Sequence, residues 1–227
     1  MASSVSQAIK KIFPLATAAI VCGSTGKDFI EGISDLDIIV IGPKKTNLDE
    51  KLTNLKRFSH DIDPMYITVN NLKNSLFCGR KPGEDYELHS FDLYRIKNQG
   101  QVLFGDPDTI KLFPDVTISQ ALHDTLPYVR DIFIKNLKVK KEIKDINLFI
   151  VIMREIYTIE TQQYGSKTSS FEYLKNKYPQ FLKLVDFVED TYLQKHPINT
   201  ITKIEISDFL NFAEQTIDSY FSSTSSP

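Results

Sequence analysis

The residues best suited to chemistry form an acidic pair, Asp35 and Asp37, at the start of a run of branched apolar residues. Side chains alternate along a strand, so both carboxylates would project from one face while Leu36 points to the other. Two neighbouring carboxylates repel each other unless a cation lies between them. Mg²⁺ is the natural candidate, because it takes hard oxygen ligands and bridges phosphate groups.

A glycine-serine bend precedes the acidic pair. Gly23 and Ser24 follow an apolar run, ten residues separate them from Asp35, and Ser34 stands directly before that acid. Glycine lets the backbone approach a phosphate closely, and a serine hydroxyl can donate a hydrogen bond to it. We therefore expect Gly23, Ser24 and Ser34 to contact the phosphates of a nucleotide.

A third carboxylate, Asp63, lies on the next expected strand. Displacement at phosphorus requires an aligned nucleophile, a neutralised triphosphate and a group that removes the hydroxyl proton. Asp63 is expected to act as a metal ligand, as the general base, or as both. The alternative is a pair of solvent-facing acids at a strand end, but the full constellation favours a site for two Mg²⁺ ions and a nucleotide.

The elements that must position these residues alternate between strands and helices in the first half of the chain. Runs of β-branched residues bounded by glycine or proline predict strands, and amphipathic stretches predict helices. We expect strands over 16–22, 35–41, 62–69 and 102–105, helices over 3–12, 47–58, 70–78 and 87–98, and a loop over 79–86.

From residue 119 onward, the apolar residues recur at helical spacing and no strand pattern appears. Helices are expected over 119–140, 145–163, 168–178, 180–194 and 206–221. The sequence thus predicts an α+β chain in three parts. These are a mixed sheet flanked by helices over 1–114, an all-α helical bundle over 115–221, and a disordered tail over 222–227.

Composition narrows the class of protein. A formal net charge of −2 over 227 residues gives no general attraction for nucleic acid or anionic membranes. No apolar stretch reaches the roughly 20 residues that a membrane span needs. The only two cysteines, Cys22 and Cys78, form neither a disulfide framework nor a zinc site. We expect a cytoplasmic monomer that binds neither membrane nor nucleic acid.

Together these residues resemble the polymerase-β-type nucleotidyltransferase superfamily, and within it the aminoglycoside adenylyltransferases that modify streptomycin and spectinomycin. The similarity spans nearly the whole chain. It continues through Phe91-Asp92-Leu93, Val102-Leu103-Phe104-Gly105 and Leu112-Phe113-Pro114, and in the helical half through Arg154-Glu155-Ile156-Tyr157-Thr158, Ser166-Lys167 and Tyr178-Pro179.

The resemblance implies a catalytic nucleotidyltransferase domain and a helical domain that completes the sites for ATP and acceptor. Asp35 and Asp37 would bind Mg²⁺, and Arg154 and Lys167 would reach the triphosphate of ATP as the co-substrate. The family's third acid is usually glutamate, whereas Asp63 is one methylene shorter. The implied reaction transfers AMP from Mg²⁺–ATP to a hydroxyl of a small cationic acceptor, with an aminoglycoside as the candidate.

Two departures from the family concern the acceptor. The chain has no tryptophan, although the family's streptomycin site uses one. Lys144, followed by Asp145, stands near the position where an acidic residue helps to bind the drug. Tyr86 and Tyr94 are the aromatic candidates to replace the tryptophan. The acidic candidates for the acceptor site are Glu84, Asp85, Glu87 and Asp145.

Three functions therefore stay open. The first is adenylyl transfer to a small hydroxylated acceptor, and the second is transfer to a protein or nucleic acid, as small antitoxin nucleotidyltransferases do. The third is a non-catalytic regulator that binds nucleotide. The intact Ser34-Asp35-Leu36-Asp37 sequence argues against the third, because a non-catalytic descendant has no need of paired acids.

Overall fold

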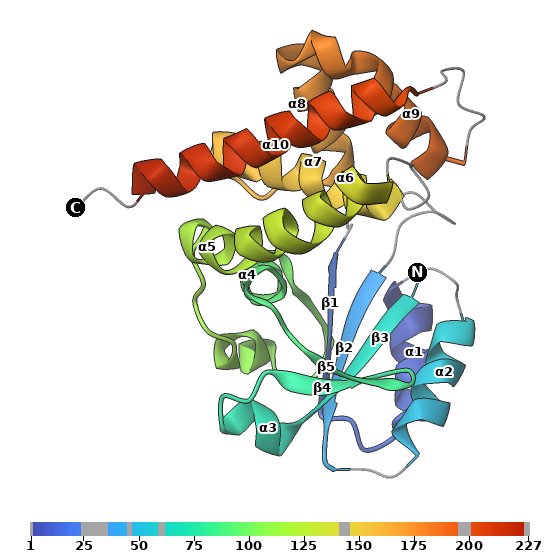
Figure 1. Cartoon of the computed structure of the whole chain (residues 1–227). Coiled ribbons are helices and arrows are strands. Elements are labelled where there is room, and N and C mark those ends of the chain that lie inside the picture. Colours follow the sequence, from blue (N-terminus) through green and yellow to red (C-terminus); the bar gives the residue numbers. More distant parts are fainter. Residues whose placement is uncertain are drawn as a thin grey trace. The chain divides into compact units, whose positions relative to one another are not determined.

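The computed structural model describes residues 2–23, 36–44, 47–58, 62–140, 146–194 and 201–224. The chain divides into two compact units, Met1–Thr117 and Ile118–Pro227 (Figure 1). The first unit holds a mixed sheet with helices, and the described part of the second contains helices only. The predicted α+β fold class is therefore confirmed.

A six-stranded mixed sheet forms the centre of the first unit, in the order β5-β4-β3-β2-β1-β6. Its strands are β1 Ala18–Gly23, β2 Leu36–Gly42, β3 Ile62–Thr68, β4 Cys78–Lys81, β5 Glu84–Glu87 and β6 Gln101–Phe104. Strands β2 and β3 are parallel, whereas β1 runs antiparallel to β2. The end of β1 and the starts of β2 and β3 therefore lie next to one another, at the same end of the sheet's strands.

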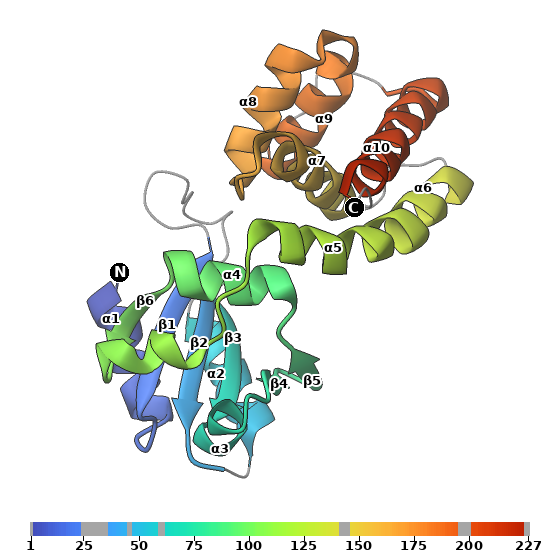
Figure 2. The same ribbon diagram turned by 90° about the vertical axis from the view of Figure 1, so that its left-hand side faces the viewer.

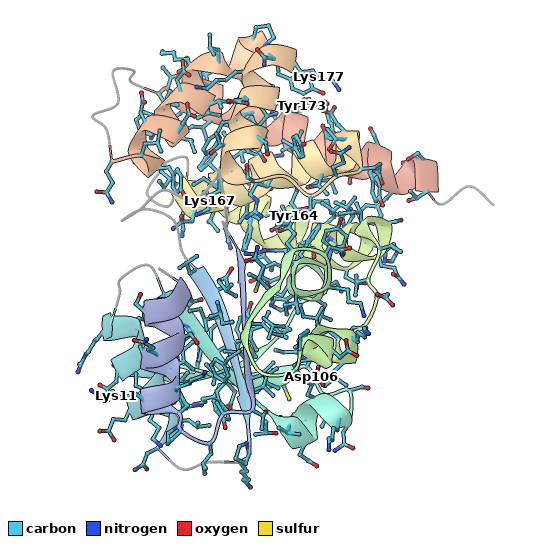
Figure 3. All side chains as sticks on the ribbon, turned by 180° about the vertical axis from the view of Figure 1, so that it is seen from behind. Lys11, Asp106, Tyr164, Lys167, Tyr173 and Lys177 are labelled. Carbon is cyan, nitrogen blue, oxygen red and sulfur yellow. The ribbon has the colours of Figure 1, made fainter. Side chains whose placement is uncertain are left out.

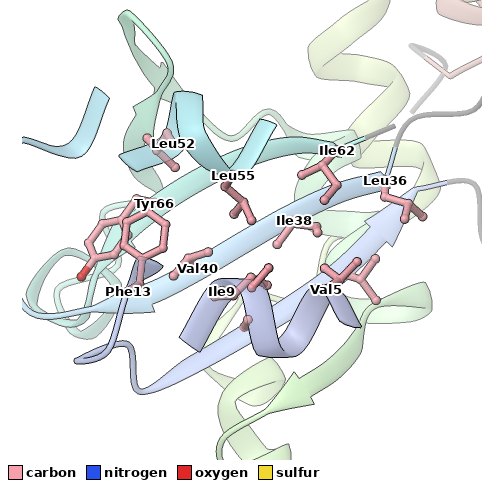
Figure 4. Packing of buried hydrophobic residues seen from close by; sticks show 13 residues of the cluster. Val5, Ile9, Phe13, Leu36, Ile38, Val40, Leu52, Leu55, Ile62 and Tyr66 are labelled. Carbon is pink, nitrogen blue, oxygen red and sulfur yellow. The ribbon is translucent and has the colours of Figure 1, made fainter. Parts of the chain in front are cut away.

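Helices cover both faces of this sheet (Figure 2). Helices α1 (Ala2–Ile12) and α2 (Leu48–Phe58) pack on one face, where Ile9 and Leu55 contact Ile38 in the core shown in Figure 4. On the other face lie α3 (Val69–Lys73) and α4 (Ser90–Gln99), where Ile96 packs against Ile39. Each such fully buried side chain stabilises the fold by about 1.5–3 kcal/mol. Burial on both faces explains why β2 is apolar beyond its polar start.

The loop predicted over 79–86 is wrong, because these residues form the antiparallel hairpin β4–β5 at one edge of the sheet. Its turn contains Gly83 at a φ of +87°, a left-handed conformation that glycine adopts without steric cost. The helix predicted to reach Cys78 ends at Lys73, and Asn71 Nδ2 donates to the Cys78 carbonyl at 3.1 Å. Strand patterns missed the hairpin because its residues are charged rather than β-branched.

Helices of the second unit pack their apolar faces around a common core. They are α5 Ile118–Tyr128, α6 Lys135–Lys140, α7 Ile146–Thr161, α8 Lys167–Lys177, α9 Leu182–Tyr192 and α10 Lys203–Thr224. The helix predicted over 119–140 contains a π-helical turn, Val129–Ile134, that follows Pro127, a residue without the N–H that an α-helix uses. No described helix is long and apolar enough to cross a membrane.

Helix α10 extends beyond the predicted end at residue 221, so Ser222–Thr224 belong to a helix and not to a disordered tail. Ser222 Oγ donates to the Asp218 carbonyl at 2.9 Å, and Thr224 Oγ1 donates to the Tyr220 carbonyl at 3.0 Å. Serine and threonine disfavour helices when their hydroxyls seek backbone partners elsewhere, and here those partners lie within the helix itself. Residues 225–227 lie outside the described part.

Candidate active site

Two of the predicted site acids, Asp37 and Asp63, lie side by side where the central strands β2 and β3 begin. They are register partners on the parallel strands β2 and β3, so their side chains project from the same face. Gly23 ends β1 and pairs with Leu36, which places the start of the predicted bend beside the acids. The other residues predicted for this part of the site, Ser24, Ser34 and Asp35, lie outside the described residues.

Each of these two acids is bonded to a cation that sequence reasoning did not single out. Arg95 Nη2, from α4, donates to Asp37 Oδ2 at 2.5 Å, and Lys81 Nζ, from β4, donates to Asp63 Oδ2 at 2.7 Å. Lys56 Nζ lies 3.9 Å from Asp63 Oδ1. Charge-assisted hydrogen bonds of this kind are strong, and they offset the repulsion between two carboxylates in adjacent register positions.

Tyr86 and Asp92 connect the two cations and line the same pocket as the acids. The Tyr86 hydroxyl donates to Asp92 Oδ2 at 2.9 Å, and Asp92 Oδ1 lies 3.9 Å from Arg95 Nη1. Lys81 Nζ lies 4.1 Å from the centroid of the Tyr86 ring, within range of a cation–π interaction. One tyrosine-aspartate pair therefore helps to orient both counter-ions of the acid pair.

Burial shifts the pKa of two groups in the pocket, the Asp37 carboxyl and the Cys22 thiol. It raises the pKa of the Asp37 carboxyl, although the Arg95 guanidinium works in the opposite direction by stabilising the carboxylate. Burial also raises the pKa of the Cys22 thiol to about 12, and the charge of Asp37 adds to this effect. Cys22 is therefore a neutral thiol at physiological pH, and the chemistry of the pocket belongs to its carboxylates.

The acid pair fits a hard divalent cation such as Mg²⁺. Asp37 and Asp63 supply carboxylate oxygens from adjacent strands, and both side chains keep some exposure to solvent, 33% and 28%. Within the described ranges, no group of three His, Cys, Asp or Glu side chains gathers to hold a metal. Asp35, the remaining predicted ligand, lies outside those ranges, so the complete ligand set stays a prediction.

Arg154 and Lys167, the two predicted phosphate ligands, lie in the helical unit. Arg154 Nε, on α7, donates to the Gly165 carbonyl at 3.3 Å, and its guanidinium carbon lies 4.6 Å from the centroid of the Tyr164 ring. Lys167 begins α8, and its Nζ lies 4.5 Å from the centroid of the Tyr192 ring. Neither cation forms an ion pair with any residue that the structure describes. Tyr164 and Lys167 both lie in the helical unit (Figure 3).

The connection between α7 and α8 holds both cations near one turn of the chain. Arg154 bonds to Gly165, two residues before Lys167, and Ser166 caps α8 by accepting from the Ser169 N–H at 3.1 Å. A lysine in the first turn of a helix opposes the helix dipole. An anion bound near this turn would relieve that conflict, so the local electrostatics favour an anionic ligand.

This arrangement of a mixed sheet followed by a helical unit has a counterpart among solved structures. The chain is similar to the crystal structure of spectinomycin adenyltransferase AAD(9) from Enterococcus faecialis with ATP and spectinomycin. The TM-score is 0.67 and the identity 16%, over 95% of this chain and 99% of that one. The predicted resemblance is therefore confirmed at the level of the fold.

A second similar structure is a mutant of the toxin–antitoxin pair MntA–HpeT. The TM-score is 0.36 and the identity 15%, over 56% of this chain and 92% of that one. No family model matches the sequence. A search of curated proteins found no match.

Proposed function

We propose that this chain is an adenylyltransferase that moves AMP from ATP to a hydroxyl group of a small acceptor and releases pyrophosphate. The observation that carries the proposal is the register pair Asp37 and Asp63, on one face of β2 and β3 beside Gly23. A fold shared along almost the whole chain with an adenylyltransferase supports it.

The proposed reaction exchanges one bond at the α-phosphorus of ATP for another. The acceptor oxygen forms the new bond, and the bond from the α-phosphorus to the oxygen that bridges to the β-phosphate breaks. Pyrophosphate leaves with the electron pair of that bond. The acceptor's hydroxyl proton passes to a carboxylate, for which Asp63 is the proposed base. Mg²⁺ held by Asp35, Asp37 and Asp63 would neutralise phosphate charge.

Binding of the triphosphate is proposed for residues of both units. Arg154 and Lys167 carry positive charges that no described carboxylate pairs, which suits them to a polyanion. Gly23, Ser24 and Ser34 are proposed to contact phosphate through backbone N–H and hydroxyl groups. We assign catalysis to residues 1–114, and completion of the ATP and acceptor sites to residues 115–221.

We propose that the acceptor is a cationic, hydroxylated molecule such as an aminoglycoside or a related drug. The similar enzyme AAD(9) is named for spectinomycin. Strand β5 exposes Glu84 and Glu87, and its Tyr86 lines the pocket of the acid pair. Glu84, two residues before Tyr86, shares its face of the strand and would attract a cationic acceptor, and Tyr86 offers it an aromatic surface.

Pyrophosphate release tests the proposal. The chain, ATP and Mg²⁺ would be incubated with spectinomycin, streptomycin and a panel of aminoglycosides. At least one acceptor should raise release by about 10²-fold or more over the acceptor-free rate, which reflects positioning of the hydroxyl. Asp37→Asn should abolish the increase.

If no small acceptor stimulates release, the small-molecule proposal fails. Transfer of labelled AMP to a macromolecule in a cell lysate would then assign the activity to a protein or nucleic-acid substrate. Absence of both signals would leave nucleotide binding without transfer, which contradicts the proposed enzyme.

A further inference from the structure

Lys81 binds the carboxylate of Asp63, which a metal ion would need as a ligand. Its Nζ bonds to Asp63 Oδ2 at 2.7 Å and lies 4.1 Å from the centroid of the Tyr86 ring. Only 21% of its side chain is exposed. The ammonium group is therefore held at the acid by the hairpin, whereas most surface lysines extend into water.

Arg95, on helix α4, binds the carboxylate of Asp37 in the same way. Its Nη2 bonds to Asp37 Oδ2, its Nη1 lies 3.9 Å from Asp92 Oδ1, and its side chain is 16% exposed. Asp92 is itself fixed, because the backbone N–H of His89 donates to its Oδ2 at 3.1 Å and closes a capping box at the start of α4. Arg95 is therefore directed at the acid pair by a capped helix.

The described charges around the pocket nearly cancel. Its lining carries three carboxylates and two cations, namely Asp37, Asp63, Asp92, Lys81 and Arg95. Lys56 adds another cation beside Asp63. A divalent ion placed among these groups would lie close to at least two positive charges, and repulsion of this kind is strong where protein partly replaces water.

We infer that Lys81 and Arg95 exclude free divalent metal from the acid pair, so that Mg²⁺ enters only together with the triphosphate of the nucleotide. Mg²⁺ gives up its water reluctantly and usually binds through one or two carboxylates together with substrate phosphates. A triphosphate supplies the negative charge that lets the metal and both cations share one site. The inference rests on the proposed function, because it takes the nucleotide as the carrier of the metal.

Binding of Mn²⁺, followed by electron paramagnetic resonance, tests this inference without measuring activity. The wild-type chain should bind Mn²⁺ weakly by itself, and a non-hydrolysable ATP analogue should raise the affinity by about tenfold or more. Lys81→Met and Arg95→Met remove the charge but keep an apolar stem. Each should raise the nucleotide-free affinity by about tenfold or more, the effect of removing a cation beside a carboxylate.

Lys111→Met is the matched control. It removes an exposed lysine whose Nζ lies 2.8 Å from Asp108 Oδ1, outside the pocket, and should leave Mn²⁺ binding unchanged. Lys81→Gln serves as a second variant if circular dichroism shows that the methionine unfolds the hairpin.

Folded Lys81 and Arg95 variants that bind free Mn²⁺ no more tightly than the wild type would overturn the inference. The cations would then position the carboxylates and would not keep metal out. Failure of the proposed function would look different. The wild-type chain would not bind Mn²⁺ with the ATP analogue, although loss of Lys81 or Arg95 would still raise the affinity for Mn²⁺ alone.

Discussion

The two units differ in how they hold the charged side chains that are predicted to bind ligands. In the sheet unit, Asp37 and Asp63 are each bonded to a cation. In the helical unit, the cations Arg154 and Lys167 lie over tyrosine rings and pair with no described acid. Glu155, which is 6% exposed, has an Oε2 without a hydrogen-bond partner among the described residues. The acids of the sheet unit are thus paired before any ligand arrives, whereas Arg154 and Lys167 of the helical unit carry charges that a bound anion would pair.

Replacement of Asp63 should give the largest effect, because it removes the proposed base and a proposed metal ligand together. Asp63→Asn should lower the rate of pyrophosphate release by about 10²–10⁴-fold, the usual loss when a general base is removed. Asp63→Glu keeps the carboxylate and should retain more activity than Asp63→Asn. Asp108→Asn, an exposed acid paired with Lys111, is the control and should keep the wild-type rate.

A wild-type rate for Asp63→Asn would remove Asp63 from the chemistry. The ion pair between Asp63 and Lys81 would then contribute to stability and not to catalysis.

The next effect concerns Glu155, a buried acid on helix α7. Burial raises the pKa of Glu155 from 4.5 to about 8. Between these two values the unfolded chain loses the proton while the folded chain keeps it, so Glu155 reduces the free energy of unfolding as pH rises. Glu155→Gln should raise that free energy at pH 8 by a few kcal/mol, at about 1.36 kcal/mol per pKa unit.

Urea denaturation followed by circular dichroism at pH 4 and pH 8 measures this difference. At pH 4 both states carry mostly the protonated acid, so the variant should gain little there. An equal gain at the two pH values would mean that packing, and not the proton, causes the change.

Removal of the unpaired cations should weaken ATP binding by a smaller factor. Arg154→Ala and Lys167→Ala should each raise the dissociation constant for ATP by about 10–100-fold, the range for hydrogen bonds to charged groups. Calorimetric titration would show the loss for ATP but not for adenosine, which lacks phosphates. Lys183→Ala is the matched control, because Lys183 Nζ already bonds to Glu205 Oε1 at 3.0 Å. Equal losses for ATP and adenosine would contradict a phosphate contact.

The smallest effect tests the hairpin that carries Lys81. Gly83 has a φ of +87°, and a Cβ added there would meet no atom within 4 Å. Gly83→Ala should therefore lower the free energy of unfolding only by the conformational cost, about 1 kcal/mol. Gly83→Asn should cost less, because asparagine tolerates this conformation. Urea denaturation of both variants measures the difference, and a larger loss for asparagine would contradict the account.

The acid pair could be predicted from the sequence because strand geometry is periodic. The side chains of a strand point alternately to its two faces. Apolar residues follow Asp37 and flank Asp63, which identifies both stretches as strands, and these two strands pair side by side. The register then places the two carboxylates side by side. The roles proposed for these acids remain predictions, and Ser24, Ser34 and Asp35 lie outside the described residues.

The counter-ions could not be predicted because they depend on contacts between distant elements. The position of Lys81 is set by pairing between β3 and β4, where a Cβ on Gly79 would lie 2.3 Å from the Tyr66 carbonyl oxygen. One signal for Arg95 was available. Asp92 and Arg95 are three residues apart on a predicted helix, which puts both on one face. No pattern showed that this face would meet Asp37.

The contrast between the two cysteines makes this chain convenient to label. Because the Cys22 thiol is buried and has a pKa of about 12, a maleimide reagent would spare it. Cys78 is partly exposed and begins β4, the strand that ends at Lys81. A fluorophore or spin label would therefore attach at one place on the native sequence, three residues from Lys81, and would report whether the hairpin shifts when nucleotide binds.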